Sequence, residues 1–173
     1  MGELSTRKIR PDGEGTEQMR MLYAASYGGR KTIPFDDLVA VSDRCDLIGL
    51  YDGDVFVGFF FTLRHKGVDI ILYMAIVEHL RRKGYGTQAV RIASRVYEGD
   101  RIVLLPDAPG VGDRLQNTRY TMIRYLDTLG FEDALYRYHF LNYDYQVLCY
   151  GGTVSKDEMD DSMRSLRRYL RCR

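Results

Sequence analysis

The stretch VDIILYMAIV, at 68–77, constrains the fold of this chain more than any other segment, because all of its residues except Asp69 are apolar. A strand with one face in water alternates apolar and polar residues, whereas a strand buried on both faces does not. A polar turn, EHLRRKGYG, follows, and then apolar residues return at the spacing of one helix face: Ala89, Val90, Ala93, Val96 and Tyr97. The segment predicts a central strand that leads through a basic turn into a helix.

The rest of the pattern places antiparallel strands before this unit and a further strand after it. CDLIGLY and VFVGFFFTL flank Asp52-Gly53, a dipeptide typical of tight hairpin turns, and Gly58 indicates a bulge or a close approach of backbone. RIVLLP, at 101–106, should complete a right-handed parallel crossover with 68–77. The other expected elements are two helices within 16–42, a helix that ends before Gly130, strands at 134–141 and 144–150, and a helix at 155–170. We predict an α+β fold with a central sheet of mixed direction.

Length and composition indicate an ordinary globular chain. Its 173 residues fit a single domain over 1–173, on which 155–173 would dock as a C-terminal helix, either on its own domain or on a second subunit of a homodimer. The formal net charge of +1 gives no overall attraction for nucleic acid or for an anionic membrane. Any anion site must therefore come from a local cluster of charge.

Targeting and metal signals are weak in this sequence. No apolar run approaches the roughly 20 residues of a membrane span, and MGELSTRKIR lacks the apolar stretch of a signal peptide. Cys45, Cys149 and Cys172 are odd in number and have no CxxC spacing, which favours a reducing, cytoplasmic location. His65 and the other two histidines are scattered, so we expect no metal site.

HLRRKGYGTQAV, at 79–90, is the segment with the clearest chemical potential. A helix start exposes unpaired N–H groups and carries a partial positive charge. Gly84 and Gly86 would let these groups approach a ligand, while Arg81, Arg82 and Lys83 add cations. The segment is either a solvated basic turn or a cradle for an anion such as a pyrophosphate.

Two nucleotide-binding patterns can be compared with this turn. The GxxxxGK[ST] phosphate loop is absent, whereas GYGTQA fits G-x-G-x-x-A, and Asp107 ends the next strand at about the spacing of a dinucleotide fingerprint. Against that alternative, EHLRRK separates the strand from the first glycine. The chain after residue 110 is also too short for the rest of a doubly wound sheet.

AIVEHLRRKGYGTQAV resembles motif A of the GNAT superfamily of acyl-CoA-dependent N-acyltransferases, whose pattern is R/Q-x-x-G-x-G/A. Arg81, Gly84 and Gly86 fill that pattern. The hairpin DGDVFVGFF, the strands at 68–77 and 101–106, and the helix that ends in DTLGF stand in the order of that family. LYAASYGGRKTIPFDDL and YQVLCYGGTVSKDEM also resemble the flanks of a bacterial GNAT branch. The resemblance implies a GNAT-like three-layer fold, with a mostly antiparallel sheet, a splayed parallel strand pair and flanking helices.

The resemblance also implies a site for acetyl-CoA as co-substrate. Backbone groups of Ile76 and Val77 would pair with the pantetheine arm, and an amide near Ile76 would polarise the thioester carbonyl. The pyrophosphate would lie on the basic turn. The residues implied there are Arg81, Arg82, Lys83, Gly84, Tyr85, Gly86 and Thr87, and Asn117 either contacts the cofactor or caps a helix.

Proton transfer is implied by the same resemblance, because an alkyl ammonium must lose a proton before it can attack a thioester. Asp107 is the first candidate base and Glu78 the second. Many GNAT enzymes carry a tyrosine as acid four residues before the glycine that ends the helix, and here that position is Leu126. Tyr125, its neighbour, is the candidate in its place. The thiolate could also leave without a protein acid.

The acceptor would be a primary amine of a small molecule or a peptide. We expect it to be bound by residues 26–38 and by the Tyr-rich hairpin, where Tyr136, Tyr138 and Phe140 alternate onto one face, with Asp36 or Asp37 near the cation. Three functions remain open at this point. They are an N-acetyltransferase, a non-catalytic acyl-CoA-binding or regulatory protein on the same fold, and a dinucleotide-binding oxidoreductase.

Overall fold

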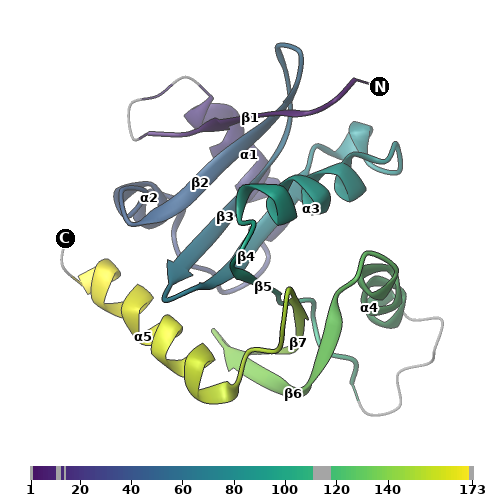
Figure 1. The fold of residues 1–173 in the computed structure, drawn as a ribbon. Coiled ribbons are helices and arrows are strands. Elements are labelled where there is room, and N and C mark those ends of the chain that lie inside the picture. The colour runs from purple at the N-terminus through teal and green to yellow at the C-terminus, as the bar shows by residue number, and fades with distance from the viewer. Residues whose placement is uncertain (1, 11–12, 14, 111–117, 172–173) are drawn as a thin grey trace.

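The computed structural model describes residues 2–10, 13, 15–110 and 118–171 (Figure 1). The elements, in chain order, are β1 (Ser5–Lys8), α1 (Thr16–Tyr27), α2 (Phe35–Ala40), β2 (Cys45–Asp52), β3 (Val55–His65), β4 (Val68–Ile76), the 3₁₀ turn η1 (Glu78–Leu80), α3 (Tyr85–Val96), β5 (Arg101–Leu104), α4 (Thr118–Thr128), β6 (Glu132–Phe140), β7 (Tyr143–Tyr150) and α5 (Lys156–Arg171).

One sheet of seven strands, in the order β1-β2-β3-β4-β5-β7-β6, organises the molecule. Its neighbours are antiparallel except for β4 and β5, which are parallel and joined through α3. The predicted mixed sheet with one parallel pair is therefore confirmed. A doubly wound parallel sheet, which the dinucleotide alternative requires, is not what this chain forms.

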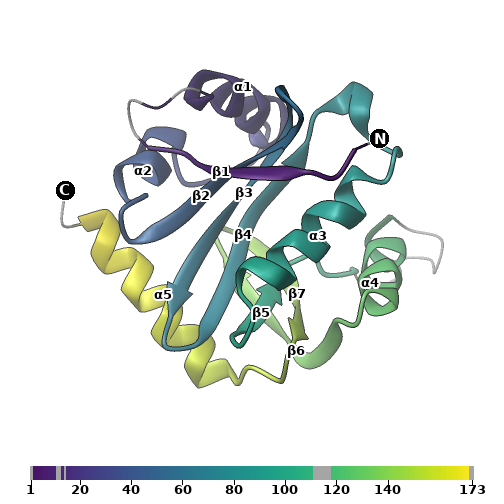
Figure 2. The same ribbon diagram turned by 45° about the horizontal axis from the view of Figure 1, so that its top comes forward.

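Helices cover both faces of the sheet and give the molecule its three layers (Figures 1 and 2). On one face, α1, α2 and α5 bury a large core against the sheet, called the core under α5 below. On the other face, α3 and α4 bury a second core, to which they contribute Tyr85, Ala89, Val90, Ala93 and Leu126. Alternate residues of a central strand point to opposite faces, so β4, with one core on each side, is apolar except at Asp69.

β4 and β5 pair over a short distance and then separate. The parallel pairing joins Val68–Ile71 to Arg101–Leu104, after which β4 runs on alone to Ile76. The chain after β5 turns toward β7, where Asp107 forms an isolated bridge with Tyr145. Pro106, which has no N–H group, stands at the departure. The result is a splayed parallel pair, with one edge of β4 exposed beyond Ile71.

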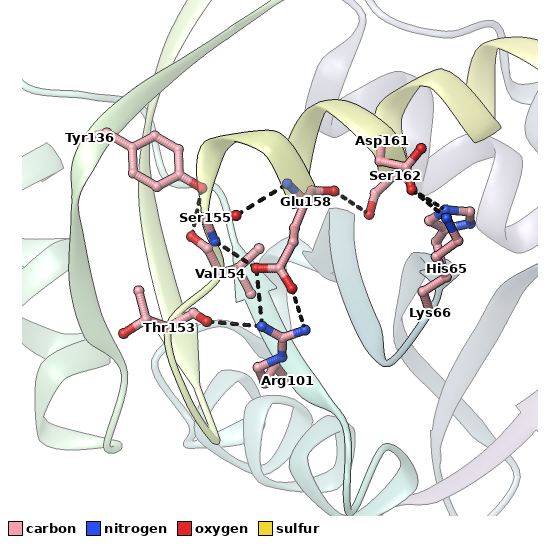
Figure 3. Close-up of polar contacts among 10 residues, drawn as sticks. All are labelled: His65, Lys66, Arg101, Tyr136, Thr153, Val154, Ser155, Glu158, Asp161 and Ser162. Atoms are coloured by element: carbon pink, nitrogen blue, oxygen red, sulfur yellow. Dashed lines mark hydrogen bonds and ion pairs between the residues drawn. The ribbon is translucent and has the colours of Figure 1, made fainter.

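The C-terminal helix lies on the chain's own sheet. Met159, Met163 and Leu166 are buried there. Arg101 of β5 makes two hydrogen bonds to the carboxylate of Glu158, at 2.7 and 3.1 Å, and Asp161 accepts from Lys66 (Figure 3). Whether α5 also meets a second subunit stays a prediction. In the part of the chain that is described, no helix combines the length and the apolar character that crossing a membrane requires.

Candidate functional site

The turn between β4 and α3 has the backbone form of an anion-binding concavity. Arg82 and Gly84 both adopt left-handed conformations, with φ of 62° and 84°. Gly84 is the N-cap of α3, whose first turn carries no acidic side chain. Successive N–H groups in such a turn converge on one point, and the helix dipole adds partial positive charge there. Arg81, Arg82 and Lys83 are exposed around the turn.

Gly86 and its neighbours Tyr85 and Thr87 determine the surroundings of the first turn of α3. A Cβ atom built on Gly86 would meet no atom within 4 Å outside its chain neighbours and its own helix backbone, so open space lies beside this glycine in the first turn of α3. Tyr85 is buried and donates its hydroxyl to Asp52, at 2.7 Å, which fixes the turn to the β2–β3 hairpin. Thr87 shares a short hydrogen bond with the hydroxyl of Tyr125 on α4.

A cavity of about 450 Å³, called the splay cavity below, lies where β4 and β5 separate. Its wall includes Ile71 and Leu104, which belong to the core under α3. It also includes Leu72 and Leu105, which pack against the core under α5 on the other face. Residues from both faces of the sheet therefore line the cavity at the splay. It extends to Gly86 and so connects the basic turn with the middle of the sheet.

The exposed edge of β4 presents the backbone of alternate residues to this cavity. Val77 donates its N–H to Val57 of β3 and accepts from Leu80, so both of its backbone groups are bonded within the protein. Since successive residues of a strand turn their backbone groups to opposite edges, Met74 and Ile76 face the splay. Of the two predicted pantetheine contacts, Ile76 thus presents its backbone to the cavity.

Two side chains already bond to this edge. Arg81 donates Nε–H to the carbonyl of Ile76, at 3.0 Å. Tyr27, at the end of α1, donates its hydroxyl to the carbonyl of Met74, at 2.8 Å, and accepts from the N–H of Met74, at 3.1 Å. Burial raises the pKa of Tyr27 to about 12. Met74 and Ile76 are therefore the positions at which a ligand could exchange hydrogen bonds with β4.

Asp107, the first candidate base, lies in an ion pair with Arg30. Both carboxylate oxygens accept from the guanidinium, each at 2.8 Å. The same guanidinium lies 4.0 Å above the ring of Tyr143. The hydrogen bonds to Asp107 raise the pKa of Arg30, which stays charged. In this arrangement each oxygen of Asp107 accepts one hydrogen bond from Arg30 and keeps a second acceptor site for another donor.

A second cavity, of about 510 Å³, lies beside this ion pair. Three connections meet around it: the α1–α2 loop with Arg30, the segment after β5 with Asp107, and the β6–β7 turn with Asn142 and Tyr143. Arg137 also reaches the cavity and donates to the carbonyl of Pro109, at 2.8 Å. The cavity thus combines charged groups of both signs with an aromatic wall.

The other predicted catalytic residues, Glu78 and Tyr125, do not line the cavity beside Asp107. Glu78 is exposed in η1 and lines neither cavity. Tyr125 lines the splay cavity, but its hydroxyl bonds to Thr87 at the start of α3, which is the end nearest the basic turn. Leu126 is buried against the core under α3. Asn117 lies outside the described residues.

The face that was expected to bind the acceptor packs inside the protein instead. Tyr136 donates its hydroxyl to Val154, and Tyr138 donates to Asp160 of α5. The pairing of β6 with β7 shifts register between Asp133 and Arg137, and Tyr138, beyond the shift, is buried in the core under α5. The sequence alone also missed Tyr27 and Arg30. A tyrosine in the last helical turn before the glycines of SYGGR was the available signal for Tyr27.

Comparison with known proteins identifies the fold. No family profile and no curated protein sequence matches the chain. A protein from Bacteroides thetaiotaomicron described as an acetyltransferase of the GNAT family superposes with a TM-score of 0.74 at 17% identity, over 92% of this chain and 94% of that one.

Two further structures extend the likeness. An aminoglycoside 6'-N-acetyltransferase complexed with coenzyme A gives a TM-score of 0.65 at 13% identity, over 84% of this chain and 95% of that one. Arabidopsis thaliana NAA60, in complex with a bisubstrate analogue, gives 0.62 at 16% identity, over 85% and 97%. At these identities the likeness concerns the fold alone, and the chain shares its fold with acetyltransferases of the GNAT family.

Proposed function

We propose that the protein is an acyl-CoA-dependent N-acetyltransferase that transfers the acetyl group of acetyl-CoA to a primary amine of a small molecule or a peptide. One observation carries the proposal: the splay cavity follows the unpaired edge of β4 and ends at a basic helix start. A long ligand with an amide-bearing arm and a pyrophosphate would find backbone partners along the arm and N–H groups at its anionic end.

The basic turn is suited to the pyrophosphate. Its left-handed residues and the first N–H groups of α3 supply donors, and Arg82 and Lys83 supply charge that is exposed to solvent. Gly86 leaves room for the phosphates to approach the helix. The pantetheine arm would take the hydrogen-bonding positions at Ile76, where Arg81 now bonds to the carbonyl. The solved complex of the aminoglycoside 6'-N-acetyltransferase contains coenzyme A on the same fold.

The proposed reaction is a direct transfer. The amine nitrogen forms a bond to the thioester carbonyl carbon, the carbon–sulfur bond breaks, and its electron pair leaves with the sulfur. The ammonium form of the acceptor loses one proton before the attack and the attacking nitrogen loses another, while the thiolate gains one from solvent or from a nearby donor. The products are an N-acetyl amide and CoA thiol, with one proton released when the acceptor starts as ammonium.

The amine would bind in the cavity of about 510 Å³ beside Asp107, called the acceptor cavity below. We propose that Asp107 receives the proton after an acceptor ammonium displaces one hydrogen bond of Arg30, since both cations compete for the same carboxylate. Tyr143, whose ring already stacks under the Arg30 guanidinium, gives this cavity an aromatic wall that suits a cation. Glu78 and Tyr125 stay as secondary candidates for proton transfer.

Ligand-dependent thermal unfolding tests the binding half of this proposal. Wild-type protein is unfolded with acetyl-CoA, with CoA, with NADH and with buffer alone. A ligand at about 100 times its dissociation constant adds about 2.7 kcal/mol to the stability of the folded state. We expect both CoA species to raise Tm and NADH to leave it unchanged.

Gly86→Val provides the sharpest variant for that experiment. The new side chain would meet open space rather than protein atoms, so the fold should persist while the phosphate position is blocked. Arg95→Val is the matched control, because it introduces the same residue on the exposed side of α3, about 14 Å further along the helix at 1.5 Å per residue. CoA shifts that survive in Gly86→Val would contradict the proposed cradle.

A non-catalytic acyl-CoA-binding protein is the second candidate. It is favoured by the burial of Leu126 at the position where a tyrosine was expected, and by the engagement of Asp107 with Arg30. Release of free thiol from acetyl-CoA across a panel of aliphatic amines, amino acids and peptides separates the two. Tight CoA binding without thiol release for any of them would favour the binding protein.

A further inference from the structure

The hydroxyl of Tyr27 has an unusual position in the splay. It comes from α1, yet it bonds to both backbone groups of Met74, a residue 47 positions away in the middle of the sheet. Its ring packs against Tyr23 and Tyr73, with centroids 5.2 and 5.1 Å away, so the side chain is held in place from behind. The hydroxyl is thus fixed on the edge of β4, and the side chain lines the splay cavity.

Strand geometry relates this position to the proposed reaction. Ile76 and Met74 are the successive residues of β4 that face the splay, and Met74 lies further from the basic turn. If the pantetheine arm pairs at Ile76, the next hydrogen-bonding position along the edge, toward the reactive end of the ligand, is Met74. The thioester would therefore arrive beside the N–H of Met74 and the hydroxyl of Tyr27.

We infer that Tyr27 is a catalytic residue: its hydroxyl proton turns from the carbonyl of Met74 to the thioester carbonyl oxygen, while the hydroxyl oxygen goes on accepting from the N–H of Met74. The inference rests on the proposed function and adds to it a donor, from a helix that the sequence did not associate with catalysis. As the amine attacks, negative charge grows on that oxygen, and a hydroxyl donor that the N–H of Met74 holds in place stabilises this charge more than it stabilises the ground state.

Three features of the site support this role. Burial keeps the Tyr27 phenol protonated at neutral pH, so it is available as a donor. The hydroxyl of Ser26, next to it in the cavity wall, is buried and has no hydrogen-bond partner among the described residues, so the cavity offers polar capacity that the protein does not use itself. The third feature is Leu126, because an apolar residue on α4 leaves Tyr27 without a competing hydroxyl from that position.

The carbonyl carbon of bound acetyl-CoA gives a direct readout, independent of any acceptor. Acetyl-CoA labelled with ¹³C at the thioester carbonyl is bound to wild-type protein and to Tyr27→Phe, and its ¹³C chemical shift is compared with that of the free ligand. Hydrogen bonds to the oxygen polarise the carbonyl and move this resonance downfield. We expect a downfield shift in the wild type that is largely lost in Tyr27→Phe, while the affinity for CoA, which has no carbonyl at that position, stays unchanged.

Tyr23→Phe is the matched control. Tyr23 lies one turn earlier on α1, its ring belongs to the same aromatic cluster, and its hydroxyl donates to a backbone carbonyl, that of Ile33, at 2.7 Å. It does not line the splay cavity. Its removal should leave the carbonyl resonance of bound acetyl-CoA where it is in the wild type.

The outcomes separate this inference from the function on which it rests. If wild-type protein binds neither CoA nor acetyl-CoA, the proposed function fails and the inference fails with it. If acetyl-CoA binds with the same carbonyl shift in wild type and in Tyr27→Phe, the inference alone is overturned, and Tyr27 only closes the strand edge. With a suitable amine, loss of this donor should lower kcat by roughly 10²–10³, as for other donors to a developing oxyanion.

A second variant protects the test against misfolding of Tyr27→Phe. Incorporation of 3-fluorotyrosine at position 27 keeps the ring and the hydroxyl and makes the phenol a stronger donor. The carbonyl resonance of bound acetyl-CoA should then move further downfield than in the wild type. An unchanged resonance in the fluorinated protein would count against the inference, whatever the behaviour of the phenylalanine variant.

Discussion

At the scale of single residues, a buried carboxylate gives the first testable prediction. Asp69, at the start of β4, is 1% exposed, and Arg64 donates Nε–H to it at 3.0 Å. Its other oxygen has no hydrogen-bond partner among the described residues. Asp100 and Asp46 also bond to or lie near Arg64 and add negative charge. Burial is the main reason why the pKa of Asp69 rises to about 6.

The raised pKa predicts a pH dependence of stability with a definite sign. The folded protein holds the Asp69 proton more tightly than the unfolded chain, so the stability contributed by this group is complete below about pH 4 and is lost as pH rises toward 6. Asp69→Asn keeps an acceptor for Arg64 and abolishes the titration. We expect the wild type to lose up to about 3 kcal/mol relative to this variant between pH 4 and pH 7, at about 1.4 kcal/mol per pKa unit.

Urea unfolding at pH 4.5 and 7.5 measures this difference. Asp54→Asn is the control, because Asp54 is a fully exposed partner of Arg7 and its replacement should have the same small effect at both pH values. An identical difference between wild type and Asp69→Asn at the two pH values would rule out the titration of this group.

Arg30 is the residue whose loss should most affect the acceptor cavity. Arg30→Met removes a bidentate ion pair with Asp107 and a stacking contact with Tyr143 but keeps most of the side-chain volume. Because both partners of the pair are about one-third exposed, we expect a loss of only about 1 kcal/mol in the free energy of unfolding.

Arg95→Met is the comparison for that measurement. It removes an exposed pair with Glu3 that has no aromatic contact, and it should change the stability by less than about 0.5 kcal/mol. Equal effects of the two substitutions in urea unfolding would show that the Arg30 pair behaves as an ordinary surface ion pair.

At the scale of elements, the order of strands and helices was predictable, but the long-range contacts of the site were not. Apolar spacing located β4, α3 and the two Tyr-rich strands, because period and turn residues are local properties. The hydrogen bonds from Tyr27 to Met74 and from Arg30 to Asp107 join residues 47 and 77 positions apart, and these depend on packing that no local pattern contains. The helical spacing of Met19, Leu22, Tyr23 and Tyr27 indicates only that Tyr27 lies on the apolar face of its helix.

β6 illustrates the same limit for side-chain direction. Alternation placed Tyr136 and Tyr138 on one face, but it could not show that this face packs toward α5, where Tyr138 bonds to Asp160. The pairing is also irregular near Leu135, which has a φ of 62°. Gly58, in contrast, was predicted as a point of close approach, and the structure confirms it. A Cβ atom there would overlap the carbonyl oxygen of Ala75 and lie 3.2 Å from the Cα of Ile76.

Gly58→Ala therefore tests how tightly β3 and β4 must approach. The new methyl group meets backbone, which cannot move aside, so β4 must shift at the residue that faces the splay. We expect a loss of about 1–3 kcal/mol in stability, as for other overpacked sites, and a smaller Tm increase with acetyl-CoA. Gly29→Ala, where a Cβ meets no atom of the described residues within 4 Å, should be neutral or slightly stabilising.

The molecule as a whole has two apolar cores that share one sheet. Met163 belongs to the core under α5 and Val90 to the core under α3, and both are buried. Since β2, β3, β4, β5 and β7 each contribute to both, neither core should survive the loss of the other. A single domain stays a prediction, and the cooperativity of unfolding tests it.

Met163→Ala should lower the stability by about 2–5 kcal/mol and keep a single transition. The measurement is urea unfolding followed by far-UV circular dichroism and by tyrosine fluorescence, which samples both faces because the chain has 14 tyrosines and no tryptophan. Val90→Ala is the companion on the opposite face. Transitions that separate between the two probes in either variant would show that the cores unfold independently.

The bonded edge of β4 also has a consequence for solubility. An unpaired strand edge is a template on which another chain can add a strand, and sheets that leave one open tend to aggregate. Here the hydroxyl of Tyr27 satisfies Met74, and the guanidinium of Arg81 satisfies the carbonyl of Ile76. A foreign strand would have to displace both side chains within a narrow opening between two layers of helices. The splay can therefore persist in the fold without making the protein prone to edge-to-edge association.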